Sequence, residues 1–175
     1  MTSNTPQSND GEIDIALLPR KCLIDTNIVI RALGERTDRD SVLCEKFFRA
    51  MFRAEGHSMY VAAPTLAEVL RGNPNTRIPS TPSIVHVPFD RRAAEIIGRD
   101  LPIRVLKLER ENHAVPISYL KYDAMICACA KLAQVDCILA LDGDFWKLAP
   151  HVEIPVKYPR DFLAAQLSLV GSDED

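Results

Sequence analysis

Two acidic residues come directly after short apolar segments of the sequence. Asp25 follows Leu23 and Ile24, and Asp142 follows the apolar run at 137–141. Apolar runs without alternation are typical of strands buried in a parallel sheet, so each carboxylate is expected at the carboxyl end of a strand. Ligands bind at that edge in open α/β sheets. Asp is also a common turn and helix-cap residue, so neither position alone indicates catalysis.

Glu68 is expected close to the same edge, in a short helix at 65–72 that follows a second apolar strand at 59–63. A local role is equally open for this residue. Thr65 and Glu68 have the spacing of a capping box, in which the glutamate side chain accepts a hydrogen bond from the threonine amide. The pattern therefore leaves two interpretations of Glu68, a helix cap and a site carboxylate.

Asp123 lies within a long predicted helix at 118–134. Ile126, Cys127 and Ala130 follow it by three, four and seven positions, so the carboxylate shares the apolar face of that helix. Burying a carboxylate there is costly unless a partner such as a metal ion compensates it. The alternative is an Asp in the first turn of the helix, where the helix dipole favours a negative charge.

One shared edge would bring together four carboxylates, namely Asp25, Glu68, Asp123 and Asp142. They would repel one another unless a divalent cation neutralised them. Ligands that are all oxygens, without His or Cys, suit Mg²⁺ or Mn²⁺, and two such ions about 4 Å apart are a known arrangement for phosphodiester hydrolysis. Asp144 is either the N-cap of a short helix at 145–148 or a further acid of this site.

Strands and helices alternate along the predicted chain. Strands are expected at 21–25, 59–63, 83–87, 137–141 and 152–156, and helices at 28–33, 40–56, 65–72, 90–100 and 118–134. Residues 104–115 favour no particular element. This alternation predicts an α/β fold with a central, mostly parallel sheet and helices on both faces. We expect one domain at 21–160, between a partly disordered N-terminal extension at 1–20 and a C-terminal tail at 161–175.

The 175-residue chain has an ordinary globular composition, with 47% hydrophobic and 26% charged residues. Its net charge of -3 argues against a protein that coats nucleic acid by positive charge, but not against a nuclease with an acidic site. Five cysteines, mostly in apolar runs, fit buried free thiols in a reducing compartment. We expect a cytoplasmic protein without a membrane partner, since no apolar stretch could span a bilayer and residues 1–10 lack a signal-peptide core.

Taken in order, the acidic segments resemble those of the PIN-domain nucleases, in particular the toxins of bacterial VapBC toxin–antitoxin pairs. The similar segments are Leu23-Ile24-Asp25-Thr26-Asn27, Thr65-Leu66-Ala67-Glu68-Val69-Leu70-Arg71-Gly72, Asp123-Ala124-Met125-Ile126-Cys127-Ala128-Cys129-Ala130 and Leu139-Ala140-Leu141-Asp142-Gly143-Asp144-Phe145. The resemblance covers about 21–158. It implies a PIN-like three-layer α/β fold, with the central sheet between two layers of helices.

The resemblance also implies roles for individual residues. The catalytic, metal-binding acids would be Asp25, Glu68, Asp123 and Asp142, with Asp144 as an auxiliary metal ligand. The activity implied is that of a Mg²⁺- or Mn²⁺-dependent endoribonuclease, in which water attacks an RNA phosphodiester in line and no covalent enzyme intermediate forms. The partners implied are a second copy of the chain, in a homodimer, and a small antitoxin protein that fills the active-site groove.

One departure from the family keeps a non-catalytic alternative open. The family often has Thr or Ser two residues before the acid after the fourth strand, and this chain has Ala140 there. The alternative function is a catalytically degenerate PIN-like module that binds RNA or a protein partner. Four unused acids at one edge would, however, destabilise such a fold by repulsion. Asn27 excludes a phosphatase of the haloacid dehalogenase type, which needs an aspartate at that position.

Overall fold

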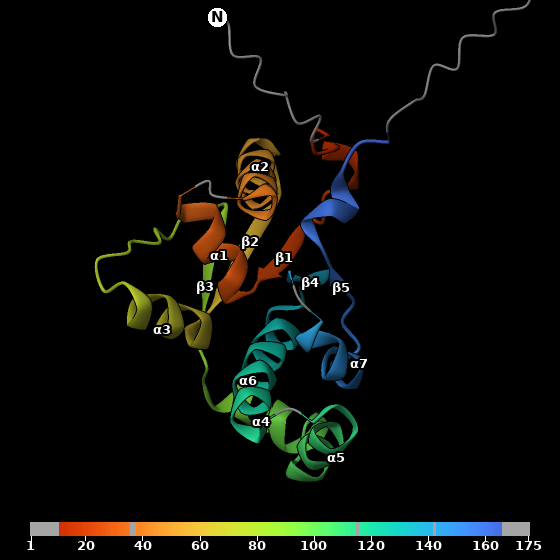
Figure 1. The fold of residues 1–175 in the computed structure, drawn as a ribbon. Coiled ribbons are helices and arrows are strands. Elements are labelled where there is room, and N and C mark those ends of the chain that lie inside the picture. Colours follow the sequence, from red (N-terminus) through yellow and green to blue (C-terminus); the bar gives the residue numbers. More distant parts are fainter. Residues whose placement is uncertain (1–10, 36–37, 115, 142, 166–175) are drawn as a thin grey trace, which may run out of the picture.

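The centre of the structure is a five-stranded parallel sheet with the strand order β3-β2-β1-β4-β5 (Figure 1). It is a computed structural model that describes residues 11–35, 38–114, 116–141 and 143–165. The strands are β1 (Lys21–Ile24), β2 (Ser58–Ala62), β3 (Ile84–Val87), β4 (Cys137–Leu139) and β5 (Val156–Lys157). All the strand pairs are parallel, so the carboxyl ends of the strands lie at one edge of the sheet.

Helices cover both faces of this sheet, and Figure 1 shows α1 and α2 on one side of it and α4 to α7 on the other. The helices are α1 (Thr26–Leu33), α2 (Arg39–Arg53), α3 (Ala63–Gly72), α4 (Arg91–Asp100), α5 (Ile103–His113), α6 (Ile117–Ala133) and α7 (Ala149–Val152), with short 3-10 helices η1 (Ile15–Leu17), η2 (Asp144–Lys147) and η3 (Pro159–Phe162). None of the helices in the described ranges is long and apolar enough to cross a bilayer.

Neighbouring residues of β1 pack into two different cores, one on each face of the sheet. Leu23 belongs to the core beneath α4 and α6, whereas Cys22 and Ile24 belong to the core beneath α1 and α2. All three side chains are at most 1% exposed. A strand that is buried on both faces shows no polar alternation, which explains the continuous apolar run. The predicted three-layer fold, with a parallel sheet between helices, is confirmed.

The structure corrects the last predicted strand. The strand expected at 152–156 is shorter and starts later, because Val152 ends the helix α7, Glu153 caps it in the left-handed conformation, and β5 comprises only Val156–Lys157. Pro150 lies in the first turn of α7, where a missing amide hydrogen costs nothing. Residues 104–115, for which the sequence favoured no element, lie mostly in α5. Only Leu106 of that helix is buried, which explains its weak apolar pattern.

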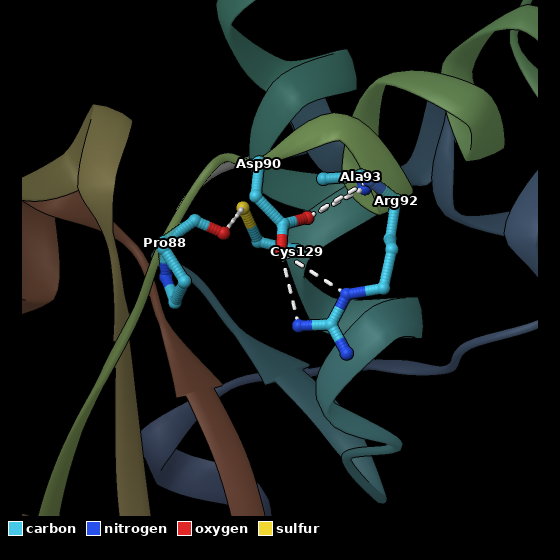
Figure 2. Close-up of polar contacts among 5 residues, drawn as sticks. All are labelled: Pro88, Asp90, Arg92, Ala93 and Cys129. Atoms are coloured by element: carbon cyan, nitrogen blue, oxygen red, sulfur yellow. Dashed lines mark hydrogen bonds and ion pairs between the residues drawn. The ribbon is translucent and has the colours of Figure 1, made fainter.

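A polar cluster fixes the start of α4 against α6 (Figure 2). One carboxylate oxygen of Asp90 accepts hydrogen bonds from the amides of Arg92 and Ala93, at 2.9 and 3.2 Å. The other oxygen accepts from the Arg92 guanidinium at 2.9 and 3.0 Å. The Cys129 thiol on α6 lies 3.8 Å from the carbonyl oxygen of Pro88. All five cysteines are buried and free, as the sequence predicts.

The described parts of the two terminal segments pair with each other. Ile13 and Leu163 form an isolated antiparallel bridge, and the Asp14 amide donates to the Phe162 carbonyl at 2.8 Å. The Phe162 ring packs beside Phe47 of α2, with 5.3 Å between the ring centroids. Residues 11–20 and 161–165 thus close over the α2 face of the sheet.

Candidate active site

Asp25 lies where β1 meets α1, and its backbone and side chain have separate roles. Its amide donates to the carbonyl of Leu139 at 3.0 Å, which continues the β1–β4 ladder by one residue. Its side chain is the N-cap of α1 and accepts from the Asn27 amide at 3.4 Å. The helix therefore begins at Thr26, two residues before the predicted start. The residue is only 6% exposed, and the positive end of the α1 dipole stabilises its carboxylate.

Glu68 does not form the capping box that its sequence pattern allows. The α3 helix begins at Ala63, so Thr65 is already its third residue and the cap position is Ala62. The Thr65 hydroxyl is buried and has no hydrogen-bond partner within the described part of the chain. The Glu68 carboxylate instead accepts a 2.5 Å hydrogen bond from the Thr26 hydroxyl. This bond joins α3 to the start of α1, across 42 residues of sequence.

Asp123 projects from α6, well inside that helix rather than in its first turn. The residue is half-buried, and Ile126, Cys127 and Ala130 on the same face are at most 1% exposed. Burial raises the pKa of the Cys127 thiol well above its ordinary value, and the nearby Asp123 carboxylate raises it further. The thiol therefore stays protonated, and the polar group that this face offers is the carboxylate.

Asp25, Glu68 and Asp123 line one cleft of about 260 Å³ at the carboxyl edge of the sheet. The other residues that line it are Thr26, Asn27, Ile30, Arg71 and Phe145. The cleft opens beside β1, where the strand order reverses. The chain passes from β1 to β2 on one side, and β4 lies on the other. A crevice at such a reversal is the usual ligand site of an open α/β sheet.

The structure does not describe the side chains of two predicted acids, Asp142 and Asp144. Asp142 lies outside the described residues. The backbone of Asp144 opens η2 and Gly143 precedes it as the N-cap residue, so Asp144 is not the cap of that helix. Its side chain lies outside what the structure describes. Phe145, the next residue, is 2% exposed and lines the cleft, which places the start of η2 beside the three located acids.

Three polar residues that line the cleft were not predicted from the sequence, namely Thr26, Asn27 and Arg71. The Thr26 hydroxyl holds Glu68 by a hydrogen bond. Arg71 follows Glu68 by three positions in the same helix and so shares its face. That spacing is the local signal that identifies Arg71. No local signal identifies Thr26, because its contact with Glu68 exists only in the folded chain.

The donor chemistry of the cleft fits Mg²⁺ or Mn²⁺, because its acidic ligands are all carboxylates. Among the residues that the structure describes, no three His, Cys, Asp or Glu side chains lie close enough together to hold a metal ion. Mg²⁺ does not require three, since proteins usually hold it through one or two carboxylates and water completes its shell. One or two of the three carboxylates of the cleft, Asp25, Glu68 and Asp123, are therefore enough for a metal site of that kind.

Comparison with known proteins shows the family to which the chain is similar. The model of the PIN domain family matches residues 22–149, a range that contains every residue of the cleft. A search among curated proteins finds no match.

Two solved structures are similar in fold. One is VapBC2 from Rickettsia felis, bound to a DNA fragment from its promoter. The alignment with VapBC2 has a TM-score of 0.50 at 13% identity, and it covers 79% of this chain and 98% of the VapBC2 chain. The other is FitAcB from Neisseria gonorrhoeae, with a TM-score of 0.47 at 18% identity and the same coverages. Because the family match extends over more than half of the sequence, the chain belongs to the PIN domain family, whose members are generally nucleases.

Proposed function

We propose that this protein is a Mg²⁺- or Mn²⁺-dependent endoribonuclease that hydrolyses RNA phosphodiester bonds. The observation that carries this proposal is the convergence of Asp25, Glu68 and Asp123 on one cleft, from three different elements of the fold. Acids from distant parts of a chain rarely meet by chance at a sheet edge, because their mutual repulsion disfavours the fold. A use that needs them together, such as metal binding, accounts for their position.

The residues of the cleft would divide the work as follows. Of Asp25, Glu68 and Asp123, one or two carboxylates would bind the ion directly and the others through its water shell, with Asp142 and Asp144 as further proposed ligands. When bound, the ion would supply Lewis-acid stabilisation of the charge that develops at the phosphodiester. Thr26 fixes the direction of the Glu68 carboxylate. Arg71 offers a cation at the same cleft to a phosphate of the bound strand.

The test is cleavage of single-stranded and structured RNA by the purified protein with Mg²⁺ or Mn²⁺. We expect EDTA, Asp25→Asn and Asp123→Asn each to abolish cutting, because each removes the ion or one of its ligands. Glu95→Gln is a matched control, since Glu95 is an exposed acid on α4 that pairs with Arg91 one turn away. Cutting that survives both EDTA and the two Asp variants contradicts the proposal.

We further propose that the enzyme is the toxin of a toxin–antitoxin pair and forms a homodimer. The similarity in fold to VapBC2 supports an antitoxin partner. So does an apolar hollow of about 310 Å³ between α1 and α3, which shares Ile30 with the acidic cleft and includes the half-exposed Leu33. Light scattering of the purified protein tests the dimer. Arrest of growth on expression, absent for Asp25→Asn, tests the toxin.

A non-catalytic PIN module is the second candidate function. It is favoured by Ala140, which is fully buried in the core beneath α6 and brings no hydroxyl to the cleft. The cleavage assay also decides this point. A wild-type protein that binds RNA or a protein partner without cutting, as do both Asp variants, would identify the binding module.

A further inference from the structure

The only tryptophan of the chain lies exposed in η2, the short helix that also contributes Phe145 to the acidic cleft. Trp146 is 52% exposed and directly follows Phe145, which lines the cleft. A Cβ atom placed on Gly143, between the predicted acids of that loop, would lie 3.9 Å from Cδ1 of the indole. A half-exposed indole is unusual in a folded protein, because tryptophan buries more apolar surface than most residues.

The indole is held by a partner that satisfies its only polar group. The Trp146 Nε1–H donates to the hydroxyl of Tyr158 at 3.1 Å, and the two rings stack with 6.3 Å between centroids and 29° between planes. The guanidinium of Arg160 lies 4.3 Å from the centroid of the Tyr158 ring. Because the indole donor is already used, the exposed part of the ring offers an apolar π surface and no further hydrogen bond.

A hollow of about 240 Å³ adjoins this ring. It is lined mainly by apolar groups, including Pro150, Pro155 and Ile154, with the exposed Glu153 as its only acid. Exposed cations lie on the same part of the chain, at Lys157 and Arg160. A flat aromatic surface with cations beside it is the combination that binds unpaired bases and their phosphates in single-stranded nucleic acids.

We propose that Trp146, supported by Tyr158 and Arg160, stacks an unpaired base of a single-stranded nucleic acid whose phosphodiester lies in the acidic cleft. The inference rests on the proposed nuclease function and names the form of its substrate. A base held beside the cleft places the neighbouring phosphate near the acids and excludes a continuous duplex, whose bases are already stacked. The platform is sequence-tolerant, since every base presents a π face.

The single tryptophan makes binding directly measurable by its fluorescence. The background is Asp25→Asn, which prevents cutting, and the probes are a short single-stranded RNA, the same sequence as DNA, and the RNA duplex. We expect the single strands to quench the emission and the duplex to leave it nearly unchanged. Emission that no single strand alters overturns the proposal.

Variants give the second readout, by anisotropy of a labelled single strand in the same background. We expect Trp146→Ala to raise the Kd by about 5- to 100-fold, the loss that removal of one base–aromatic stack produces. Trp146→Phe, which keeps an aromatic face, should lose much less. Phe52→Ala is the matched control, because Phe52 is 48% exposed but lies at the end of α2, which leads into the opposite edge of the sheet.

Failure of this platform is distinguishable from failure of the nuclease. A wild-type protein that cuts RNA, with a Trp146→Ala variant of unchanged KM and Kd, refutes the base platform and leaves the nuclease intact. Quenching by single strands without any cutting by the wild type supports the platform and refutes the nuclease.

Discussion

Thr26→Val tests how the candidate site is held together. The substitution removes the hydroxyl that donates to Glu68 at 2.5 Å and keeps the branched shape of a side chain that is 9% exposed. A hydrogen bond to a charged group contributes about 1.5–3 kcal/mol to stability. Glu68 is only half-buried, so water partly replaces the lost donor. We therefore expect the free energy of unfolding to fall by about 1–2 kcal/mol, measured by urea denaturation with an unchanged m-value.

The effect on cleavage should exceed the effect on folding. Without the Thr26 hydroxyl, the Glu68 carboxylate is free to rotate about its long side chain. A displacement of about 1 Å in a reacting site costs up to about 100-fold in rate. We expect kcat/KM for RNA cleavage to fall about 10- to 100-fold in Thr26→Val, at temperatures where the variant remains folded. Thr26→Ser keeps the hydroxyl and should retain most of the activity.

Two results would refute this reasoning. One is a Thr26→Val protein with the stability and cleavage rate of the wild type, which would mean that the hydroxyl neither stabilises the fold nor orients Glu68. The other is an equal loss of activity in Thr26→Val and Thr26→Ser, which would attribute the effect to packing at the start of α1 rather than to the hydrogen bond.

Further predictions concern stability and the thiols. Asp100 accepts from the Arg99 guanidinium at 2.7 Å and pairs with Lys131 of α6 at 3.0 Å, and chiefly the Arg99 bond lowers its pKa to about 2. The pKa of Asp100 in the folded state lies below the ordinary 3.8. The stabilisation that its ion pairs give the fold is therefore complete above pH 3.8 and is lost as the pH falls toward 2. Asp100→Asn should cost about 1 kcal/mol at neutral pH, and its difference from the wild type should shrink as the pH falls toward 2 and vanish below it. A difference that persists there contradicts the pairing. Burial raises the pKa of the Cys129 thiol to about 12, so iodoacetamide should leave the native protein unmodified and label it fully in urea. Mass spectrometry that finds rapid labelling of the native thiols would contradict their burial.

The fold could be predicted from the sequence because the strongest signals are local. The segments that became β1 and β4 are buried almost throughout, so their apolar runs lack any alternation. The helix α6 was equally clear, since seven of its 17 residues are buried, five of them in the unbroken run 126–130. The weak elements are those with little burial. In α5 only Leu106 is buried, and β5 is two residues long beside a proline, so neither leaves a recognisable pattern.

The candidate site could be predicted only in part. The position of Asp25 follows from its place between β1 and α1, whereas that of Glu68 depends on a contact with a distant part of the sequence. The two interpretations of Asp25 are compatible, since a carboxylate that caps α1 also lines the cleft. The structure selects one of the two interpretations of Glu68, because Thr65 is not the cap residue of α3 and the carboxylate accepts from Thr26. The helix start decides between them. Once Pro64 lies in the first turn, Thr65 is too far into α3 to be a cap, and the Glu68 side chain is left to reach across to α1.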